Sequence, residues 1–167
     1  MFLYYKQGKI PSLPIIEKGI IIKKNNPHPI VPNMGTMQMG RKRLLYFKIM
    51  TFLCRGFHRV LKEYDLIIDN KIVSKAVLIS KVPIYKFLPN NGIHLCYCET
   101  LQAFRGKGYY PLLLKYIQND NIDEDLYMVV DENNVSSIKG IEKAGFIKYA
   151  QGRKINNRYF VIDEYLD

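Results

Sequence analysis

Alternating or β-branched hydrophobic runs predict strands along most of the chain. The clearest pair lies on either side of Asp69 and Asn70, two residues that tolerate the left-handed turn of a hairpin. We therefore expect these two runs to form an antiparallel pair. The two runs before residue 35 lie among prolines and extended loops, so they predict only short strands. The hydrophobic runs cover residues 1–6, 19–24, 64–69, 71–80, 93–101, 125–130, 146–151 and 158–166.

Other segments have their hydrophobic residues at helical spacing. One covers residues 109–118, directly after a glycine-containing loop, and a second covers residues 135–144. Asn133 or Asn134 can cap the second helix, and Gly145 suits the left-handed residue that often follows a helix. Residues 37–63 also follow helical rather than alternating spacing, with Gly56 as a break between two helices.

The order of elements after residue 92 is strand, glycine loop, helix, strand, helix, strand, strand. A helix that connects two strands of one sheet makes them parallel, so 93–101 and 125–130 are expected to be parallel neighbours. The sequence thus predicts an α/β (α+β) fold. We expect a mixed, mostly antiparallel sheet of six to seven strands with a parallel central pair and about four helices.

Length and composition predict a single domain, residues 1–167. The 167 residues are 48% hydrophobic and 24% charged, which is typical of a globular chain. The longest apolar stretch, residues 44–54, is interrupted by Lys48 and is shorter than the ~20 residues that a membrane span requires. No secretory signal is visible at the start, so we expect a cytoplasmic location.

The three cysteines suit a reducing compartment, because they are odd in number and lack paired zinc-ligand spacing. Cys96 and Cys98 lie two residues apart on a predicted strand. We expect them to share one face of that strand as small buried residues. No metal site is predicted.

The net charge of +10 is concentrated in the first third of the chain. Residues 1–60 contain eleven Lys or Arg and one acid, Glu17, whereas residues 61–167 contain fourteen of each sign. This asymmetry favours an anionic partner for the first third, although a solubilising surface would have the same composition.

The residues Arg105, Gly106, Lys107 and Gly108 directly precede the helix that begins at Tyr109. Amides at a helix start have no intrahelical acceptor, and the helix dipole adds positive potential there, so the position favours an anion. Glycines let the backbone approach the ligand closely. The run lacks the spacing and hydroxyl of a Walker loop and the third glycine of a dinucleotide fingerprint. The loop is therefore predicted to bind phosphate in a different way, unless it is only a structural turn.

The run Ala103-Phe104-Arg105-Gly106-Lys107-Gly108 resembles the pyrophosphate loop of the GNAT superfamily, the acyl-CoA-dependent N-acyltransferases. That family shows Gln/Arg-x-x-Gly-x-Gly/Ala after its fourth strand, and here Ala103 replaces the usual Gln or Arg. A second resemblance lies downstream, at Asn134, Ser137, Gly145 and Phe146. The match covers residues 92–147, an expected acyl-CoA-binding core, and the order of elements extends it to most of the chain.

The resemblance implies that acetyl-CoA is the acyl donor. It implies that amides of the loop hold the coenzyme's pyrophosphate, and that the end of the preceding strand and the start of the second helix contact the pantetheine arm. An amine would attack the thioester carbonyl directly, while a backbone amide of the strand polarises that carbonyl. The implied cofactor-binding residues are Thr100, Leu101, Arg105, Gly106, Lys107, Gly108, Tyr109, Asn134 and Ser137.

His94 and Glu99 are the candidates for a catalytic base, because family members present a His or Glu from this strand. The competing interpretations are that His94 is a buried structural histidine and that Glu99 forms a surface ion pair. Strict alternation would place the two on opposite faces unless a bulge intervenes. Ile141 stands where many family members carry a tyrosine that protonates the departing thiolate. Candidate substitutes, each also expected to have a packing role, are Tyr109, Tyr110 and Tyr149.

The resemblance and the charge asymmetry together predict an N-acetyltransferase. Its acceptor would be the primary amine of an anionic small molecule, such as a nucleotide- or lipid-linked amino sugar, bound on the side of the basic region 1–60. The alternative is a catalytically weak CoA-binding or membrane-surface protein that keeps the GNAT fold. We expect no nucleic-acid partner, and the sequence leaves peripheral membrane contact and the choice between monomer and homodimer open.

Overall fold

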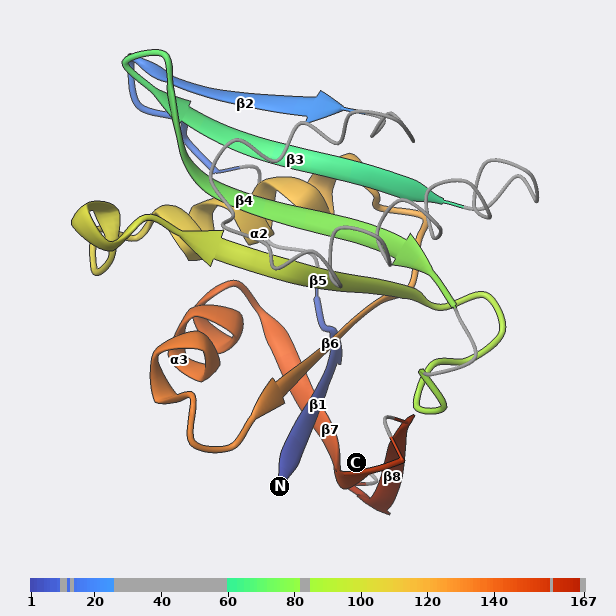
Figure 1. Cartoon of the computed structure of the whole chain (residues 1–167). Helices are drawn as coiled ribbons and strands as arrows, with labels where there is room; N and C mark the ends of the chain where they lie inside the picture. The colour runs from blue at the N-terminus through green and yellow to red at the C-terminus, as the bar shows by residue number, and fades with distance from the viewer. Residues whose placement is uncertain (10–11, 13, 26–59, 82–84, 157, 166–167) are drawn as a thin grey trace.

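The computed structural model describes residues 1–9, 12, 14–25, 60–81, 85–156 and 158–165. They form one eight-stranded sheet, two α-helices and a short 3-10 helix, η1 (Figure 1). The predicted helical region 37–59 lies outside the described residues. The elements are β1 (Phe2–Gln7), β2 (Ile20–Asn25), β3 (Leu61–Ile68), β4 (Lys71–Ser80), β5 (Ile93–Thr100), η1 (Gln102–Phe104), α2 (Tyr109–Asp120), β6 (Leu126–Asp131), α3 (Val135–Lys143), β7 (Phe146–Ile155) and β8 (Arg158–Glu164).

The strands are ordered β2-β3-β4-β5-β6-β1-β7-β8. All neighbours are antiparallel except β5 and β6, which are parallel, as the crossover through α2 predicts. These two strands pair only at Ile93 with Leu126 and at His94 with Tyr127. Beyond that point they diverge (Figure 1). The sheet therefore has two halves, β2-β3-β4-β5 and β6-β1-β7-β8.

Two counts differ from the sequence prediction. The sheet has eight strands rather than six to seven, because both short N-terminal runs join it, β1 in the middle and β2 at an edge. The described residues contain two α-helices rather than about four, and residues 61–63 begin strand β3 instead of ending a helix. The two described strands of the basic region, β1 and β2, therefore lie in different halves of the sheet.

Side chains of the sheet alternate between two cores, one on each face. The core beneath the helices includes Leu113 and Leu114 of α2 and Ile141 of α3. The opposite core is rich in aromatic residues. Tyr4 and Tyr5 show the alternation: both are 0% exposed, yet Tyr5 belongs to the first core and Tyr4 to the second.

A β-bulge in β5 changes which face its last residues occupy. Between the pairs Lys75–Glu99 and Val77–Cys96, β5 contains one residue more than β4, and Tyr97 takes a positive φ of 49°. Cys96 therefore packs with the aromatic core and Cys98 with the helix-side core. The prediction that the two cysteines share one face is wrong, because the bulge interrupts the alternation.

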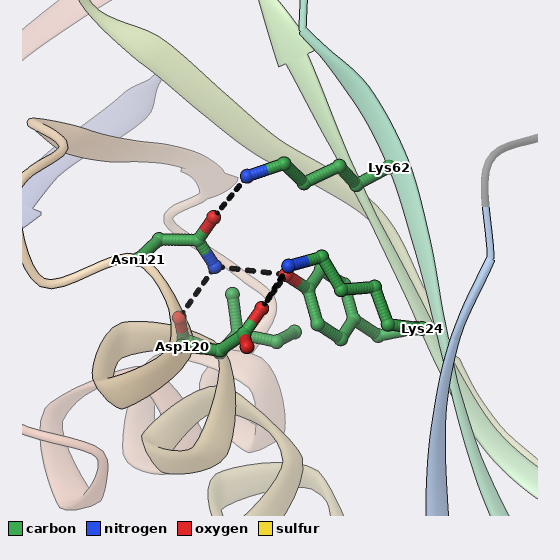
Figure 2. A network of polar contacts seen from close by, with 6 residues as sticks. Lys24, Lys62, Asp120 and Asn121 are labelled. Carbon is green, nitrogen blue, oxygen red and sulfur yellow. Dashed lines mark hydrogen bonds and ion pairs between the residues drawn. The ribbon is translucent and has the colours of Figure 1, made fainter.

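A polar network attaches the C-terminal end of α2 to β2 and β3 (Figure 2). Asp120 accepts hydrogen bonds from Lys24 at 2.7 Å and from Tyr64 at 2.5 Å. Asn121 donates to the Tyr64 hydroxyl at 2.9 Å and accepts from Lys62 at 2.7 Å. Burial alone would raise the pKa of Asp120, but the bonds from Lys24 and Tyr64 hold it below its ordinary value. Because the network holds the end of α2, it helps to fix the direction in which the N-terminus of the helix points.

A buried charge cluster lies on β3 and β4. The Lys75 ammonium group forms an ion pair with Glu63 and lies 3.4 Å from the Asp65 carboxylate. All three side chains are at most 2% exposed. Burial raises the pKa of both carboxyl groups, while the Lys75 charge opposes that shift. The cluster has two carboxyl groups around one ammonium group, so its stability depends strongly on Lys75.

Candidate functional site

The glycine loop leads from β5 into α2, and there is open space beside both of its glycines. Gly106 and Gly108 have φ of 75° and 81°, and a Cβ at either would meet nothing within 4 Å. Gly108 is the N-cap of α2, and no side chain caps the helix there. The first amides of α2 are therefore available to an anion that approaches the loop.

A cavity of about 580 Å³, here called the loop cavity, lies between this loop, the end of β5 and the start of α3. It is lined by eight of the sequence-predicted site residues: Glu99, Thr100, Arg105, Gly106, Gly108, Tyr109, Asn134 and Ser137. The predicted residues Leu101, Lys107 and His94 are not among those that line it. The Lys107 ammonium group instead lies 5.2 Å from the ring centre of Phe104.

The charges that line the loop cavity favour an anionic ligand. Arg105 comes from the loop, Lys139 and Lys143 come from α3, and Glu99 is the acidic residue among the lining side chains. Arg105 is held in place by a 3.0 Å hydrogen bond from its Nε to the Thr100 carbonyl oxygen. The arrangement can bind phosphate groups through side-chain cations and helix amides together.

Asn134, one of the two residues predicted as caps, is the N-cap of α3. Its Oδ1 accepts from the Ser137 amide at 3.2 Å and from the Ser136 hydroxyl at 3.1 Å. The cap sets the start of α3 at the cavity wall. Ser136, Lys139 and Lys143 then follow on one face of the helix at spacings of three and four residues.

The two base candidates occupy different environments. His94 is 3% exposed, and its ring centre lies 4.3 Å from that of Tyr85 and 5.3 Å from that of Phe87. Burial lowers the pKa of His94 to about 3, so the side chain is neutral at physiological pH. Glu99 is partly exposed, lines the loop cavity and directly follows Cys98 after the bulge.

Tyr110 of α2 lies very close to Gly140 of α3. A Cβ at Gly140 would lie 2.4 Å from Cδ1 of Tyr110, so the absence of a side chain at 140 makes room for the ring. Tyr110 and Cys98 both line the cavity. Ile141, the next residue of α3, is 1% exposed in the helix-side core.

Sequence reasoning missed several lining residues, namely Cys98, Ser136, Lys139, Gly140 and Lys143. Helical spacing from the predicted Asn134 cap would have indicated the lysines. Nothing in the sequence marks Cys98, because its position depends on the bulge. In the part of the chain that the structure describes, no group of three or more His, Cys, Asp or Glu residues could hold a metal ion. Nor does any described helix combine the length and hydrophobicity needed to cross a bilayer.

The chain is similar to known proteins in structure but not in sequence. No family model and no curated protein matches the sequence. One similar solved structure is a tandem GNAT protein from the clavulanic acid biosynthesis pathway, with a TM-score of 0.61 and 13% sequence identity. A second is a GNAT-family acetyltransferase of Colwellia psychrerythraea, with a TM-score of 0.56 and 16% identity. A third is a GCN5-related N-acetyltransferase-like protein of Streptococcus suis, with a TM-score of 0.54 and 17% identity. The matches cover 89%, 88% and 89% of this chain but 50%, 52% and 58% of those chains, respectively. The chain thus spans little more than half the length of these structures.

Proposed function

We propose that this chain, which has the fold of the GNAT superfamily, is an acyl-CoA-dependent N-acyltransferase. The observation on which the proposal rests is the loop cavity, where an uncapped helix start and three cationic side chains meet at the end of β5. That combination suits the pyrophosphate and 3′-phosphate of acetyl-CoA. The GNAT fold, shared with structures described as acetyltransferases, supports acyl transfer as the reaction.

The loop amides from Gly106 to Tyr109 would hold the pyrophosphate of the coenzyme, because the Arg105 amide, also predicted for this role, already donates to the Gln102 carbonyl oxygen at 3.2 Å. The end of β5 at Thr100 would pair with the pantetheine arm, and Asn134 and Ser137 would contact it from the start of α3. Leu101 does not line the cavity, and its amide donates to the Val73 carbonyl oxygen at 2.9 Å. Lys139 and Lys143 would add positive charge for the phosphates. The coenzyme supplies an activated acyl group, and these residues bind and orient it.

Glu99 is the better candidate for the base. It lines the loop cavity, whereas His94 is enclosed by aromatic rings and has a strongly lowered pKa. An amine with a lysine-like pKa near 10.4 is almost wholly protonated at pH 7, so it must lose a proton before it attacks. Glu99 would accept that proton directly or through water.

We propose an anionic amine as the acceptor, because the first third of the chain contributes the whole positive excess. Much of that charge, including Arg41-Lys42-Arg43, lies outside the described residues. A nucleotide- or lipid-linked amino sugar fits this description. Among amines, anionic ones are expected to be acylated fastest, and added salt is expected to slow them. Equal turnover of a neutral amine would contradict an anionic acceptor.

Coenzyme binding is the first test, and the substitution Gly108→Asp is the informative one. A carboxylate at the N-cap would occupy the helix amides and repel phosphate, so we expect acetyl-CoA to bind at least about 30-fold more weakly, roughly 2 kcal/mol. Isothermal titration calorimetry measures this directly. Gly19→Asp is the matched control: Gly19 has φ of 95°, a Cβ there meets nothing within 4 Å, and it lies before β2, away from the cavity.

Three outcomes of this titration distinguish an acyltransferase from a CoA-binding protein without turnover and from a protein that does not bind the coenzyme. Binding by the parent and by Gly19→Asp, with weak binding by Gly108→Asp, supports the coenzyme site and leads to a screen of amine acceptors. Binding without product from any amine would favour a CoA-binding protein that lacks turnover. No binding by the parent would refute the acyltransferase proposal.

A further inference from the structure

One end of the sheet exposes hydrophobic and basic side chains together. The antiparallel order places the start of β2, the hairpin between β3 and β4, and the end of β5 at this end (Figure 1). Ile20 of β2 pairs with Ile68 of β3, which in turn pairs with Lys71 of β4. We call this region the hairpin-end surface and define it by six side chains: Ile15, Ile16, Lys18, Lys71, Phe104 and Lys107.

Two adjacent isoleucines form the apolar part of this surface next to β2. Ile15 is 92% exposed and Ile16 is 37% exposed. They directly precede a turn in which the Ile20 amide donates to the Glu17 carbonyl oxygen at 3.1 Å, so the turn holds them near the start of β2. Water does not favour such a contact area, and an apolar phase would remove it from water.

An aromatic ring between two ammonium groups forms the other part of the surface. The Lys71 and Lys107 ammonium groups lie 5.9 Å and 5.2 Å, respectively, from the ring centre of Phe104. Both lysines are exposed, and Phe104 is half-buried. An amphipathic arrangement of this kind suits the boundary between water and an apolar phase.

The charge of the surface and its flanking residues favours an anionic occupant. Exposed cations outnumber exposed acids, Lys18, Lys71, Arg105 and Lys107 against Glu17 and Asp69. A second copy of the chain, docked through the same surface, would bring like charges together. Nucleic acid would match the charge but would leave the isoleucines without an apolar partner. An anionic lipid bilayer offers both phosphate groups and hydrocarbon.

We propose that the hairpin-end surface docks the protein on an anionic lipid bilayer. The side chains of Ile15, Ile16 and Phe104 enter the boundary between headgroups and acyl chains, and the lysines meet the lipid phosphates. Docking does not require the coenzyme. Phe104 also lines the loop cavity, so docking holds that cavity beside the bilayer. A lipid-linked amine would then be the acceptor within reach, a consequence that rests on the proposed function.

Co-sedimentation with lipid vesicles tests the docking. The parent should bind vesicles of equal parts phosphatidylcholine and phosphatidylglycerol at about 0.1 M salt and be released at about 1 M, where the Debye length falls to about 3 Å. Vesicles of phosphatidylcholine alone should bind it much more weakly. Ile15→Ser should reduce the affinity about tenfold. Ile122→Ser is the matched control, because Ile122 is 58% exposed but follows the opposite end of α2, and it should leave the affinity unchanged.

A pair of lysine substitutions tests the electrostatic part. Lys71→Gln combined with Lys107→Gln should weaken binding to the anionic vesicles about 30-fold, as expected for two cations near a negative surface. The matched control combines Lys148→Gln with Lys154→Gln. These lysines of β7 are also exposed, and their ammonium groups also lie over aromatic rings. The control pair should stay within about threefold of the parent.

A tryptophan reporter locates the contact directly, because the chain contains no tryptophan. The fluorescence of Ile15→Trp should shift to the blue on anionic vesicles and be quenched by brominated lipid, whereas that of Ile122→Trp should not change. Circular dichroism confirms that each variant is folded.

Several results would overturn the inference while leaving the coenzyme site intact. One is the absence of vesicle binding by the parent. Another is binding that survives unchanged in both Ile15→Ser and the Lys71 and Lys107 pair, since another part of the chain would then hold the membrane. A DNA duplex that binds parent and Ile15→Ser equally, while vesicles fail to bind, would assign the surface to nucleic acid instead. Conversely, vesicle binding by a chain that does not bind acetyl-CoA would support the docking and refute only the acyltransferase proposal.

Discussion

Replacing Lys75 with methionine is expected to lower the free energy of unfolding by about 3 to 5 kcal/mol at pH 7. Methionine has a similar length but no charge. The substitution would leave the Glu63 and Asp65 carboxyl groups, at most 2% exposed, without the cation that now pairs with them. Urea denaturation of parent and variant, followed by circular dichroism, measures the difference.

The loss should depend on pH in a defined direction. Burial already raises the pKa of both carboxyl groups in the folded protein, and removing Lys75 raises it further. A carboxyl group whose folded pKa is raised favours folding most when it is protonated, and this contribution is lost as the pH rises through the folded pKa. The deficit of Lys75→Met should therefore grow as the pH rises and shrink as the solution is made more acidic.

Two controls accompany this prediction. Lys71→Met replaces an exposed lysine at the start of the same strand and should cost less than about 1 kcal/mol. Adding Glu63→Gln and Asp65→Asn to Lys75→Met should recover part of the lost stability, because it removes the unpaired charges. A loss below about 1 kcal/mol for Lys75→Met would show that the cluster tolerates its net negative charge.

Removing residues 1–8 is expected to abolish cooperative folding. Strand β1 lies between β6 and β7, so its deletion would expose an unpaired edge on each. It would also remove Tyr4 and Tyr5, which are fully buried and donate to the Phe160 carbonyl oxygen at 3.0 Å and to the Glu142 carboxylate at 2.9 Å. Loss of two buried aromatic side chains costs roughly 3 to 5 kcal/mol each, which is comparable to the whole stability of a typical domain.

Thermal denaturation and near-ultraviolet circular dichroism would detect this loss. A synthetic peptide of residues 1–9 should restore the cooperative transition when added to the truncated chain. The same peptide with proline at position 4 should not, because proline lacks the amide and fits poorly within a central strand. A truncated chain that still unfolds cooperatively without peptide would show that the β6 and β7 edges can join in another way.

Local features of the fold could be predicted from the sequence, and features that depend on distant pairing could not. The Asp69-Asn70 hairpin, the parallel pair of β5 and β6 and the helix from Tyr109 follow from patterns within short windows of sequence. The position of β1 does not, because its alternation is compatible with any place in the sheet. The same limit applies to the candidate site: the glycine loop is visible as a motif, but its neighbours on α3 and β5 depend on tertiary packing.

The bulge at Tyr97 and the buried Lys75 show why the environment of some single residues could not be predicted from the sequence. Tyr97 is an ordinary strand residue by composition, and nothing nearby marks the positive φ that turns Cys98 and Glu99 to new faces. Lys75 interrupts an otherwise hydrophobic run in the way that an exposed residue would. Its burial becomes intelligible only when β3 brings two carboxylates opposite it.

The central place of β1 also constrains the order in which the protein can assemble during its synthesis. Strand β1 leaves the ribosome before both of its partners and must wait for β6 and for β7, whose Gly152 pairs with Phe2. At typical translation rates of about 5 to 20 residues per second, that interval is roughly 7 to 30 s. For that time a run of aromatic residues has no native partner and is exposed to wrong pairing or to chaperones. The second half of the sheet can therefore close only after most of the chain has been translated.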